Sequence, residues 1–408
     1  MTRLKERYLN YTQTERDGRI PALDGARALF VFFVGYYHIW QQSWLTPAFF
    51  IGGQYFSLDF LVRSGYIWVD ALLLLSGFLL YLPYAQAQED EKALPRVLPF
   101  YRNRILRIVP SYYFNILIML LFVALPQKLY MAGDRVTLDT TRMLKDLAAH
   151  ATFTHTLFDF SYIGSPLNGS LWTLGVEMQF YLIFPLLARL FGKKPLLTYL
   201  GMTGVAFGYR YWVSTLPNIS LYFNQLPAQL DVYANGMVAA CIYSALKRRM
   251  KQDRWSQVLF TALFFVAASA IVTLLHTQNS FKNIQMGQMH HRFSFSVLVA
   301  LCMLGVLYGF SGLRLLLGNR ITRILSEISF QFYIWHQVFA VQLKRWRIPV
   351  SMYENPWMES DRPWQYLYTF LCFGGALAIS CVMTYLFEQP IARYGRRKDQ
   401  KDKKRKKA

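Results

Sequence analysis

The chain contains ten stretches of about 20 mostly apolar residues, the length that an α-helix needs to cross a membrane. They lie at residues 22–42, 66–86, 108–126, 171–190, 195–214, 227–246, 256–275, 293–311, 324–342 and 364–386. Of the 408 residues, 54% are hydrophobic and only 16% are charged, against about 25% charged in soluble proteins. The sequence therefore predicts an all-α, polytopic membrane helix bundle with about ten transmembrane helices.

Lysine and arginine are distributed unevenly between the predicted loops. If both termini are cytoplasmic, the inner segments carry 31 basic residues and the outer segments carry 11; these outer segments are 43–65, 127–170, 215–226, 276–292 and 343–363. Basic loops of membrane proteins tend to stay in the cytoplasm, so both termini are predicted to be cytoplasmic. The same rule accounts for the net charge of +21, and no nucleic-acid partner is expected.

We expect three regions: a cytoplasmic N-terminal segment (1–21), a membrane domain (22–390) and a basic cytoplasmic tail (391–408). The N-terminal segment is polar and basic, so no cleavable signal peptide is predicted. The longest outer segment contains apolar, helical stretches around Met143–His155 and is predicted to be a lid over the outer face.

Ionisable residues inside membrane spans are costly and are therefore functional candidates. In the first span, Arg27 lies near the inner end and His38 near the outer end. Eleven residues correspond to three helical turns plus about 20°, so both side chains share one face, about 16 Å apart along the axis. Structural alternatives are an anchoring role for Arg27 at the inner interface and a packed polar role for His38.

Four further spans carry ionisable residues in their outer parts: Asp70, Glu177, Asp231 and His336. Together with His38 they predict a polar cavity open to the outer face, with imidazoles and a carboxylate that can move protons. The alternatives are a hydrogen bond to a neighbouring helix for Glu177 and a helix-end acid for Asp70.

The segment FYRNRILRIVP places Arg102, Arg104 and Arg107 close together at the inner face if it is helical. Arg27 lies at the same level. Such a cluster is either ordinary cytoplasmic charge or a binding site for a phosphorylated carrier.

Metal chemistry is not predicted. The four cysteines (Cys241, Cys302, Cys372 and Cys381) lie in apolar runs without metal-ligand spacing. The pairs His150 with His155 and His290 with His291 do not supply a convincing ligand set. Neither a disulfide framework nor a zinc site is expected.

Six segments in order resemble the acyltransferase-3 family of integral membrane acyltransferases. The first, RIPALDGARALFVFFVGYYHIW, carries the family's pattern of Arg, ten residues and His at Arg27 and His38. The others are YIWVDALLLLSGFLL, RNRILRIVPSYY, GSLWTLGVEMQFYLIFPLL, ISFQFYIWHQVF and YLFEQPIARY. The resemblance covers residues 20–395. Asn103 departs from it, since the family often has the first of two adjacent arginines there, and Arg102 is a candidate substitute.

The resemblance implies transfer of an acyl group, often acetyl, from cytoplasmic acyl-CoA to a hydroxyl of an extracytoplasmic acceptor, such as a cell-surface or lipid-linked glycan. It implies a plasma-membrane location and a donor site at Arg27, Arg102, Arg104 and Arg107. His38 is expected to act as general base or as transient acyl carrier, with Glu177 or Asp70 orienting it. His336 is expected to be a second proton acceptor or to bind the acceptor.

A proton-coupled secondary transporter is the alternative, because ten spans with intramembrane His and Glu would suit one. The polar residues, however, form separate inner and outer sets, whereas transporters bind their substrates at a midplane site.

Overall fold

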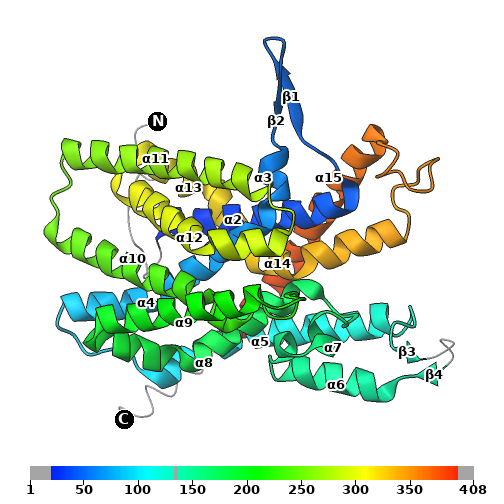
Figure 1. Cartoon of the computed structure of the whole chain (residues 1–408), viewed down its shortest axis with the longest axis horizontal. Coiled ribbons are helices and arrows are strands. Elements are labelled where there is room, and N and C mark those ends of the chain that lie inside the picture. The colour runs from blue at the N-terminus through cyan, green and yellow to red at the C-terminus, as the bar shows by residue number, and fades with distance from the viewer. Residues whose placement is uncertain (1–19, 133–136, 394–408) are drawn as a thin grey trace. The chain divides into compact units, whose positions relative to one another are not determined.

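The computed structural model describes residues 20–132 and 137–393, which are predominantly helical. Each of the ten predicted spans coincides with a helix (Figure 1): α2 (Pro21–Ser43), α4 (Trp68–Glu89), α5 (Val97–Met119), α8 (Trp172–Lys193), α9 (Pro195–Ser214), α10 (Leu230–Arg249), α11 (Arg254–Gln278), α12 (Ile284–Tyr308), α14 (Arg320–Arg345) and α15 (Arg362–Val382). The predicted helical class is confirmed. The predicted end segments, 1–21 and 391–408, lie largely outside the described residues.

Within the described ranges, six helical segments are long and apolar enough to cross a membrane. They are Gly65–Glu89, Val97–Ala124, Gly169–Lys193, Arg254–Gln278, Ile284–Tyr308 and Arg362–Arg393. Two of them are extended by π-helical turns, Leu120–Ala124 after α5 and Met383–Glu388 after α15. The count of ten spans and the side of each terminus stay predictions.

Short elements connect the long helices. They are the strands β1 (Ala48–Ile51), β2 (Gln54–Ser57), β3 (Met131–Ala132) and β4 (Thr137–Leu138), the helices α3 (Asp59–Arg63), α6 (Thr140–Ala151), α7 (Asp159–Tyr162) and α13 (Ser311–Leu317), and the 3-10 turns η1 (Gly65–Ile67), η3 (His155–Leu157), η4 (Gly169–Leu171) and η5 (Leu226–Gln229). The strands form two antiparallel pairs, β1 with β2 and β3 with β4. The predicted helix around Met143–His155 is largely α6.

Local chemistry fixes several helix starts. The Asp139 side chain accepts a 2.9 Å hydrogen bond from the backbone N–H of Arg142 at the start of α6. Asp253 accepts one of 2.8 Å from the N–H of Ser256 at the start of α11. Such caps satisfy N–H groups that have no partner within the helix. Pro21 begins α2, where its missing N–H costs nothing.

The chain divides into two compact units. Unit 1 comprises the chain up to Pro95 together with Ile183–Ser329, and unit 2 comprises Arg96–Leu182 together with the chain from Phe330 on. Two of the three unit boundaries therefore fall inside helices, in α8 and α14, and the third lies between α4 and α5.

In unit 1, α4 and α10 approach closely at two glycines. A Cβ atom on Gly236 would lie 2.2 Å from the carbonyl oxygen of Leu74, and one on Gly77 would lie 2.5 Å from that of Tyr233. Small residues let membrane helices pack backbone to backbone. The contact holds the start of α4, which carries Asp70, against α10.

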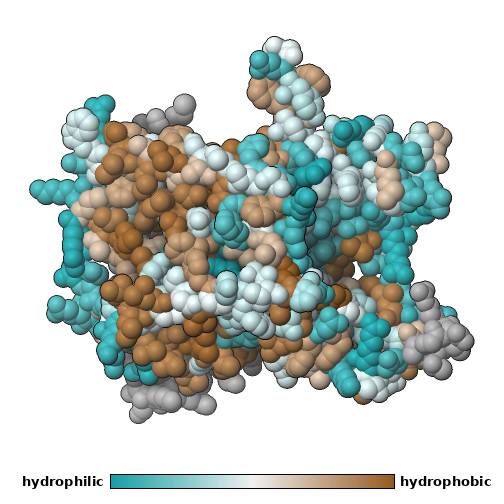
Figure 2. Space-filling model, in the orientation of Figure 1, coloured by the Kyte–Doolittle hydropathy of each residue, from teal (hydrophilic) through white to brown (hydrophobic). Residues whose placement is uncertain are grey.

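The surface of α11 is apolar along its length. Its exposed side chains include Val258, Leu259, Phe265, Val266 and Val272. Figure 2 shows apolar residues covering the molecule in this region. A water-soluble protein rarely exposes so many large apolar side chains on one helix, whereas a helix that faces lipid requires them.

Candidate active site

The predicted site residues divide between the two units. Unit 1 holds Arg27, His38 and Asp70, and unit 2 holds Arg102, Arg104, Arg107, Glu177 and His336. The joint action of His38 and Glu177 stays a prediction, and each group is described within its own unit below.

Arg27 and His38 lie on one uninterrupted helix, α2. The Arg27 guanidinium forms an ion pair with Asp24 one turn earlier, at 3.3 Å, and both side chains are partly exposed. The His38 ring is half-buried and lies 5.3 Å from that of Tyr37. Because α2 is continuous, the predicted separation of about 16 Å along its axis holds.

Asp70 is fully buried at the start of α4 and pairs with Arg292 on α12, at 3.3 Å. The same guanidinium donates to the backbone carbonyl of Phe223, at 2.8 Å, and to the side-chain oxygen of Asn224, at 3.1 Å. Arg292 ends the predicted outer segment 276–292, but in the structure it lies within α12, which begins at Ile284. A charged arginine is accommodated there because Asp70 balances its charge.

A second buried pair lies beside the first. Arg210 on α9 donates to Asp231 on α10, at 3.0 Å. Arg210 and Arg292 both also donate to the carbonyl oxygen of Ala228, at 3.2 and 3.4 Å. The structure therefore places Asp70 and Asp231, both predicted to line an open cavity, in a buried network of two ion pairs.

In unit 2, Glu177 on α8 faces Tyr333 on α14. The carboxylate of Glu177 acts electrostatically on the Tyr333 hydroxyl, which accepts a 2.8 Å hydrogen bond from Thr173. Tyr333 in turn lies beside His336, with ring centroids 5.8 Å apart. Two predicted residues are thus linked through Tyr333, which we did not single out although it lies in the same sequence motif as His336.

His336 is fully buried, and its Nδ1 lies 2.9 Å from the carbonyl oxygen of Phe332. A carbonyl can only accept a hydrogen bond, so the neutral ring carries its proton on Nδ1. The basic nitrogen of His336 is then Nε2, and proton transfer by this residue would take place there.

Asn168 joins three helices of unit 2 just before α8. Its amide donates to Asn115 on α5, at 3.0 Å, and to the carbonyl of Ile334 on α14, at 2.7 Å. Its oxygen accepts from the backbone and the hydroxyl of Ser170. Asn168 was not predicted, although it immediately precedes the motif that contains Glu177.

The arginine segment of unit 2 is helical, which is the condition under which its three arginines lie within two turns, and it forms the first half of α5. The Arg104 guanidinium lies over the rings of Phe100 and Tyr181, 5.9 and 5.5 Å from their centroids. Arg102 is half-buried and Arg107 is exposed. Contact with Tyr181 places Arg104 against α8, the helix that carries Glu177.

The predicted lid contains a buried polar network. Asp146 accepts hydrogen bonds from Tyr130 and from Ser165 and lies 3.0 Å from the Nδ1 of His150. The rings of His150 and His155 stack with centroids 4.3 Å apart. Burial and the neighbouring His150 lower the pKa of His155 to about 3. The network joins the elements of the lid to one another.

His155 also packs on α8. A Cβ on Gly175 would lie 2.7 Å from its ring, and the side-chain amide of Gln179 donates to the Phe153 carbonyl, at 3.0 Å. The lid is therefore attached to the face of α8 that carries Gly175 and Gln179. Among the described residues, no group of three or more His, Cys, Asp and Glu could hold a metal ion.

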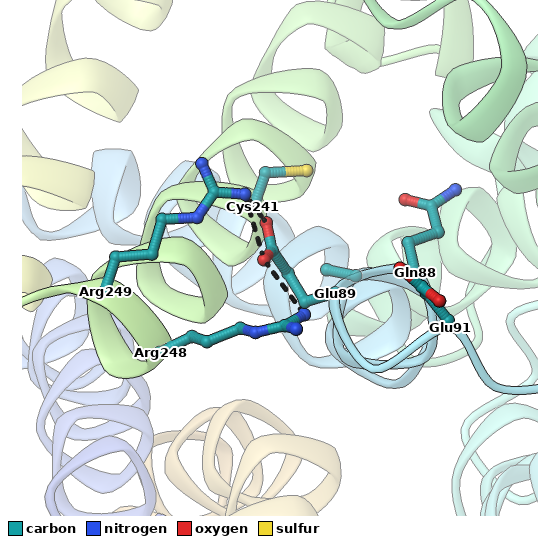
Figure 3. Close-up of a pocket in the computed structure, with 7 residues that line it drawn as sticks. Gln88, Glu89, Glu91, Cys241, Arg248 and Arg249 are labelled. Carbon is teal, nitrogen blue, oxygen red and sulfur yellow. Dashed lines mark hydrogen bonds and ion pairs between the residues drawn. The ribbon is translucent and has the colours of Figure 1, made fainter.

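A pocket of about 420 Å³ lies in unit 1 where α4 and α10 end. Figure 3 shows the Glu89 carboxylate facing both Arg248 and Arg249, at 3.7 and 3.2 Å, with Cys241 beside them. From the sequence, these arginines were expected only to contribute charge at the inner face. Because Glu89 already pairs with both guanidinium groups, an anionic ligand that bound them would compete with its carboxylate.

These features define the class of protein: a helical membrane protein with ionisable residues held at defined positions inside its helices. An acyltransferase-3 family model, described as an acyltransferase domain, matches residues 20–388. The chain belongs to this family and is an O-acyltransferase, as the resemblance implied.

The names of similar proteins agree with this family. A protein of Acidianus two-tailed virus named as an acetyltransferase is 28% identical over 81% of this chain and 86% of its own length. A Staphylococcus aureus protein named as an O-acetyltransferase is 21% identical over 81% of this chain, which spans about half (52%) of that protein. Bacillus subtilis YrhL, named as a peptidoglycan O-acetyltransferase, is 30% identical over 43% of this chain and 25% of its own length. No solved structure matches the chain.

Proposed function

We propose that the protein transfers an acetyl group from cytoplasmic acyl-CoA to a hydroxyl group of an extracytoplasmic glycan, in the plasma membrane. The observation that carries the proposal is the Arg27 and His38 pair on the continuous helix α2, inside the region that the family model matches. Relatives named as O-acetyltransferases support acetyl as the group transferred.

The reaction exchanges one bond for another. The acceptor oxygen forms a bond to the acyl carbon, the bond from that carbon to the CoA sulfur breaks, and the hydroxyl proton ends on the thiolate. A base on the acceptor side must take the proton first, since a sugar hydroxyl has a high pKa; such a base contributes about 10²- to 10⁴-fold. His38 is that base, or carries the acyl group between donor and acceptor.

The remaining candidates have supporting roles. Glu177 or Asp70 orients the imidazole and balances its charge, and His336 accepts a proton at Nε2 or binds the acceptor. Arg27, Arg102, Arg104 and Arg107 bind the phosphates of the donor, since guanidinium groups pair with phosphate oxygens in two-pronged geometry. No metal takes part in this scheme.

The test is release of free CoA thiol by purified protein given acetyl-CoA and crude surface glycan. We expect glycan-dependent release by the unmodified protein and by His290→Ala, which alters an exposed histidine on α12, and none by folded His38→Ala. Full activity of His38→Ala would overturn the role of His38. If no acyl-CoA of any chain length supports release, the proposed donor is wrong.

A further inference from the structure

The hairpin β1–β2 presents large apolar side chains on both of its faces. The register places Phe49 opposite Phe56 and Phe50 opposite Tyr55, and neighbouring residues of a strand point to opposite faces. The exposed fractions are 50% for Phe49, 77% for Phe50, 67% for Ile51, 57% for Tyr55 and 46% for Phe56. Residues 44–58 contain no charged side chain, although the chain as a whole is strongly basic.

The base of the hairpin is fixed to the end of α11. The ring of Phe60, on α3, stacks on that of His276 with centroids 4.0 Å apart. The Phe60 carbonyl accepts a hydrogen bond from the side chain of Asn279, at 3.3 Å, and the Ser64 hydroxyl donates to the Leu275 carbonyl, at 3.2 Å. Since α11 is long and apolar enough to span a membrane, its end marks a membrane surface.

The hairpin runs across the direction of α11 and α12, not along it (Figure 1). Membrane helices lie within about 40° of the bilayer normal. An element that starts at the end of such a helix and crosses its direction therefore extends along the membrane surface. In Figure 2 the protruding hairpin carries apolar residues together with paler and hydrophilic ones.

We propose that the hairpin β1–β2 is an interfacial anchor, which inserts its aromatic side chains among the lipid headgroups at the end of α11. Tyrosine and tryptophan, whose rings have an apolar and a polar part, concentrate at both surfaces of a bilayer, and apolar side chains such as phenylalanine are buried at the boundary between headgroups and acyl chains. At the end of α2, the rings of Trp40 and Trp44 lie 5.8 Å apart and extend the aromatic surface.

Lipid fits this surface better than a protein partner does. A specific protein interface uses charged and hydrogen-bonding side chains to select its partner, and the only strand side chains here that can form hydrogen bonds are Gln54, Tyr55 and Ser57. An aromatic hairpin left in water would be prone to aggregate edge to edge. The proposal concerns the membrane surface at the end of α11, and holds for either orientation of the chain and for any acyl donor.

The test places an environment-sensitive fluorophore on the hairpin. Cys241, Cys302, Cys372 and Cys381 are replaced by Ala, and Phe50→Cys is labelled in the full chain, reconstituted in phosphatidylcholine nanodiscs. Tyr55→Cys provides a second hairpin position. Lys282→Cys is the matched control, because Lys282 is exposed and follows the same end of α11.

We expect lipids that carry a nitroxide near the headgroup to quench both hairpin probes. Aqueous iodide should quench these two probes several-fold less than it quenches the Lys282 probe. Iodide quenching equal to that of the control, without lipid quenching, would overturn the proposal. Discs with one copy are compared with discs holding two. Protection that appears only with two copies would show that the hairpin docks on a second copy, which also overturns it.

Discussion

Asp70 on α4 and Arg292 on α12 form an ion pair at 3.3 Å, and neither side chain has exposed surface. Removing one partner would leave the other as an uncompensated buried charge, which costs about 3–5 kcal/mol. We expect Asp70→Leu and Arg292→Met to lower the thermal unfolding midpoint in detergent strongly, as measured by intrinsic tryptophan fluorescence. The double variant should recover most of the loss, because both charges are then gone.

The exposed pair of Arg323 and Glu327, at 3.0 Å, is the control. Surface pairs contribute about 0–1 kcal/mol, so Glu327→Gln should barely change the midpoint. Equal effects of Asp70→Leu and Glu327→Gln would contradict the prediction. The double variant also separates two roles of Asp70. If it is stable but inactive, the result would support the predicted catalytic role of Asp70. If it is stable and active, the role of Asp70 is structural.

A second prediction concerns the packing of α4 on α10. Gly236→Ala would place a methyl group 2.2 Å from the Leu74 carbonyl oxygen, so the helices would have to separate. Overpacking of this kind costs about 1–3 kcal/mol. Gly201→Ala on α9 is the control, since nothing lies within 4 Å of its Cβ position. It should be neutral or stabilising, because Ala favours a helix by about 1 kcal/mol over Gly. Similar unfolding midpoints for both variants would refute the close contact.

The helices could be predicted from the sequence because their signals are local. Apolar runs of membrane length and caps such as Asp253 act within one segment, so each predicted range overlaps an observed helix, although α5 and α12 begin well before the predicted starts at 108 and 293. The ion pairs could not be predicted in the same way. Asp70 and Arg292 are 222 positions apart, and no pattern in either segment reveals the other. Asp70 and Asp231 therefore suggested an open cavity, although each carboxylate faces an arginine.

The residues of the candidate site could likewise be predicted only where the signal lies within one sequence motif. The motifs pointed to Glu177 and His336 but not to Tyr333, which links them, because its role depends on the packing of α14 against α8. The hairpin had a local signal that was missed. Gly52 and Gly53 separate two aromatic runs and adopt positive φ angles of 58° and 81°, the conformation that tight two-residue turns require.

A third prediction concerns the pH dependence of the lid. Folding lowers the pKa of His155 from 6.5 to about 3. Between these values the unfolded lid binds a proton that the folded lid does not, so its stability falls as the pH falls. Above pH 6.5 the His155 ring is neutral in both the folded and the unfolded lid, so this loss of stability is absent. Amide hydrogen exchange of α6 and η3, corrected for the intrinsic rate, should therefore show protection decreasing as the pH is lowered from 6.5 towards 3.

His155→Gln removes the titrating ring and keeps a polar side chain. The variant leaves Asp146, His150 and Tyr112 in place, so the slope of protection against pH between 6.5 and 3 should become shallower. An unchanged slope would show that another group controls the response.

A fourth prediction tests Glu177. Glu177→Gln keeps the shape of the side chain and removes its charge, so under the proposed function the imidazole would lose the charge that is expected to orient it. We expect CoA release to fall by about 10²-fold or more, within the range of general acid–base effects, with little change in the unfolding midpoint. Glu359→Gln, which alters an exposed acid, should retain activity. Full activity of Glu177→Gln would show that the charge of Glu177 takes no part in the reaction.

The fifth prediction separates the charge of Arg104 from its packing. Arg104→Gln removes a guanidinium that is expected to bind a donor phosphate, and hydrogen bonds to charged groups contribute about 1.5–3 kcal/mol. The KM for acyl-CoA should therefore rise roughly 10- to 100-fold, with a smaller change in kcat. Phe100→Leu removes an aromatic ring that lies 5.9 Å from the guanidinium carbon but keeps the charge, so its KM should change little. If both variants raise KM equally, Arg104 acts by holding α5 against α8, and the donor phosphates bind elsewhere.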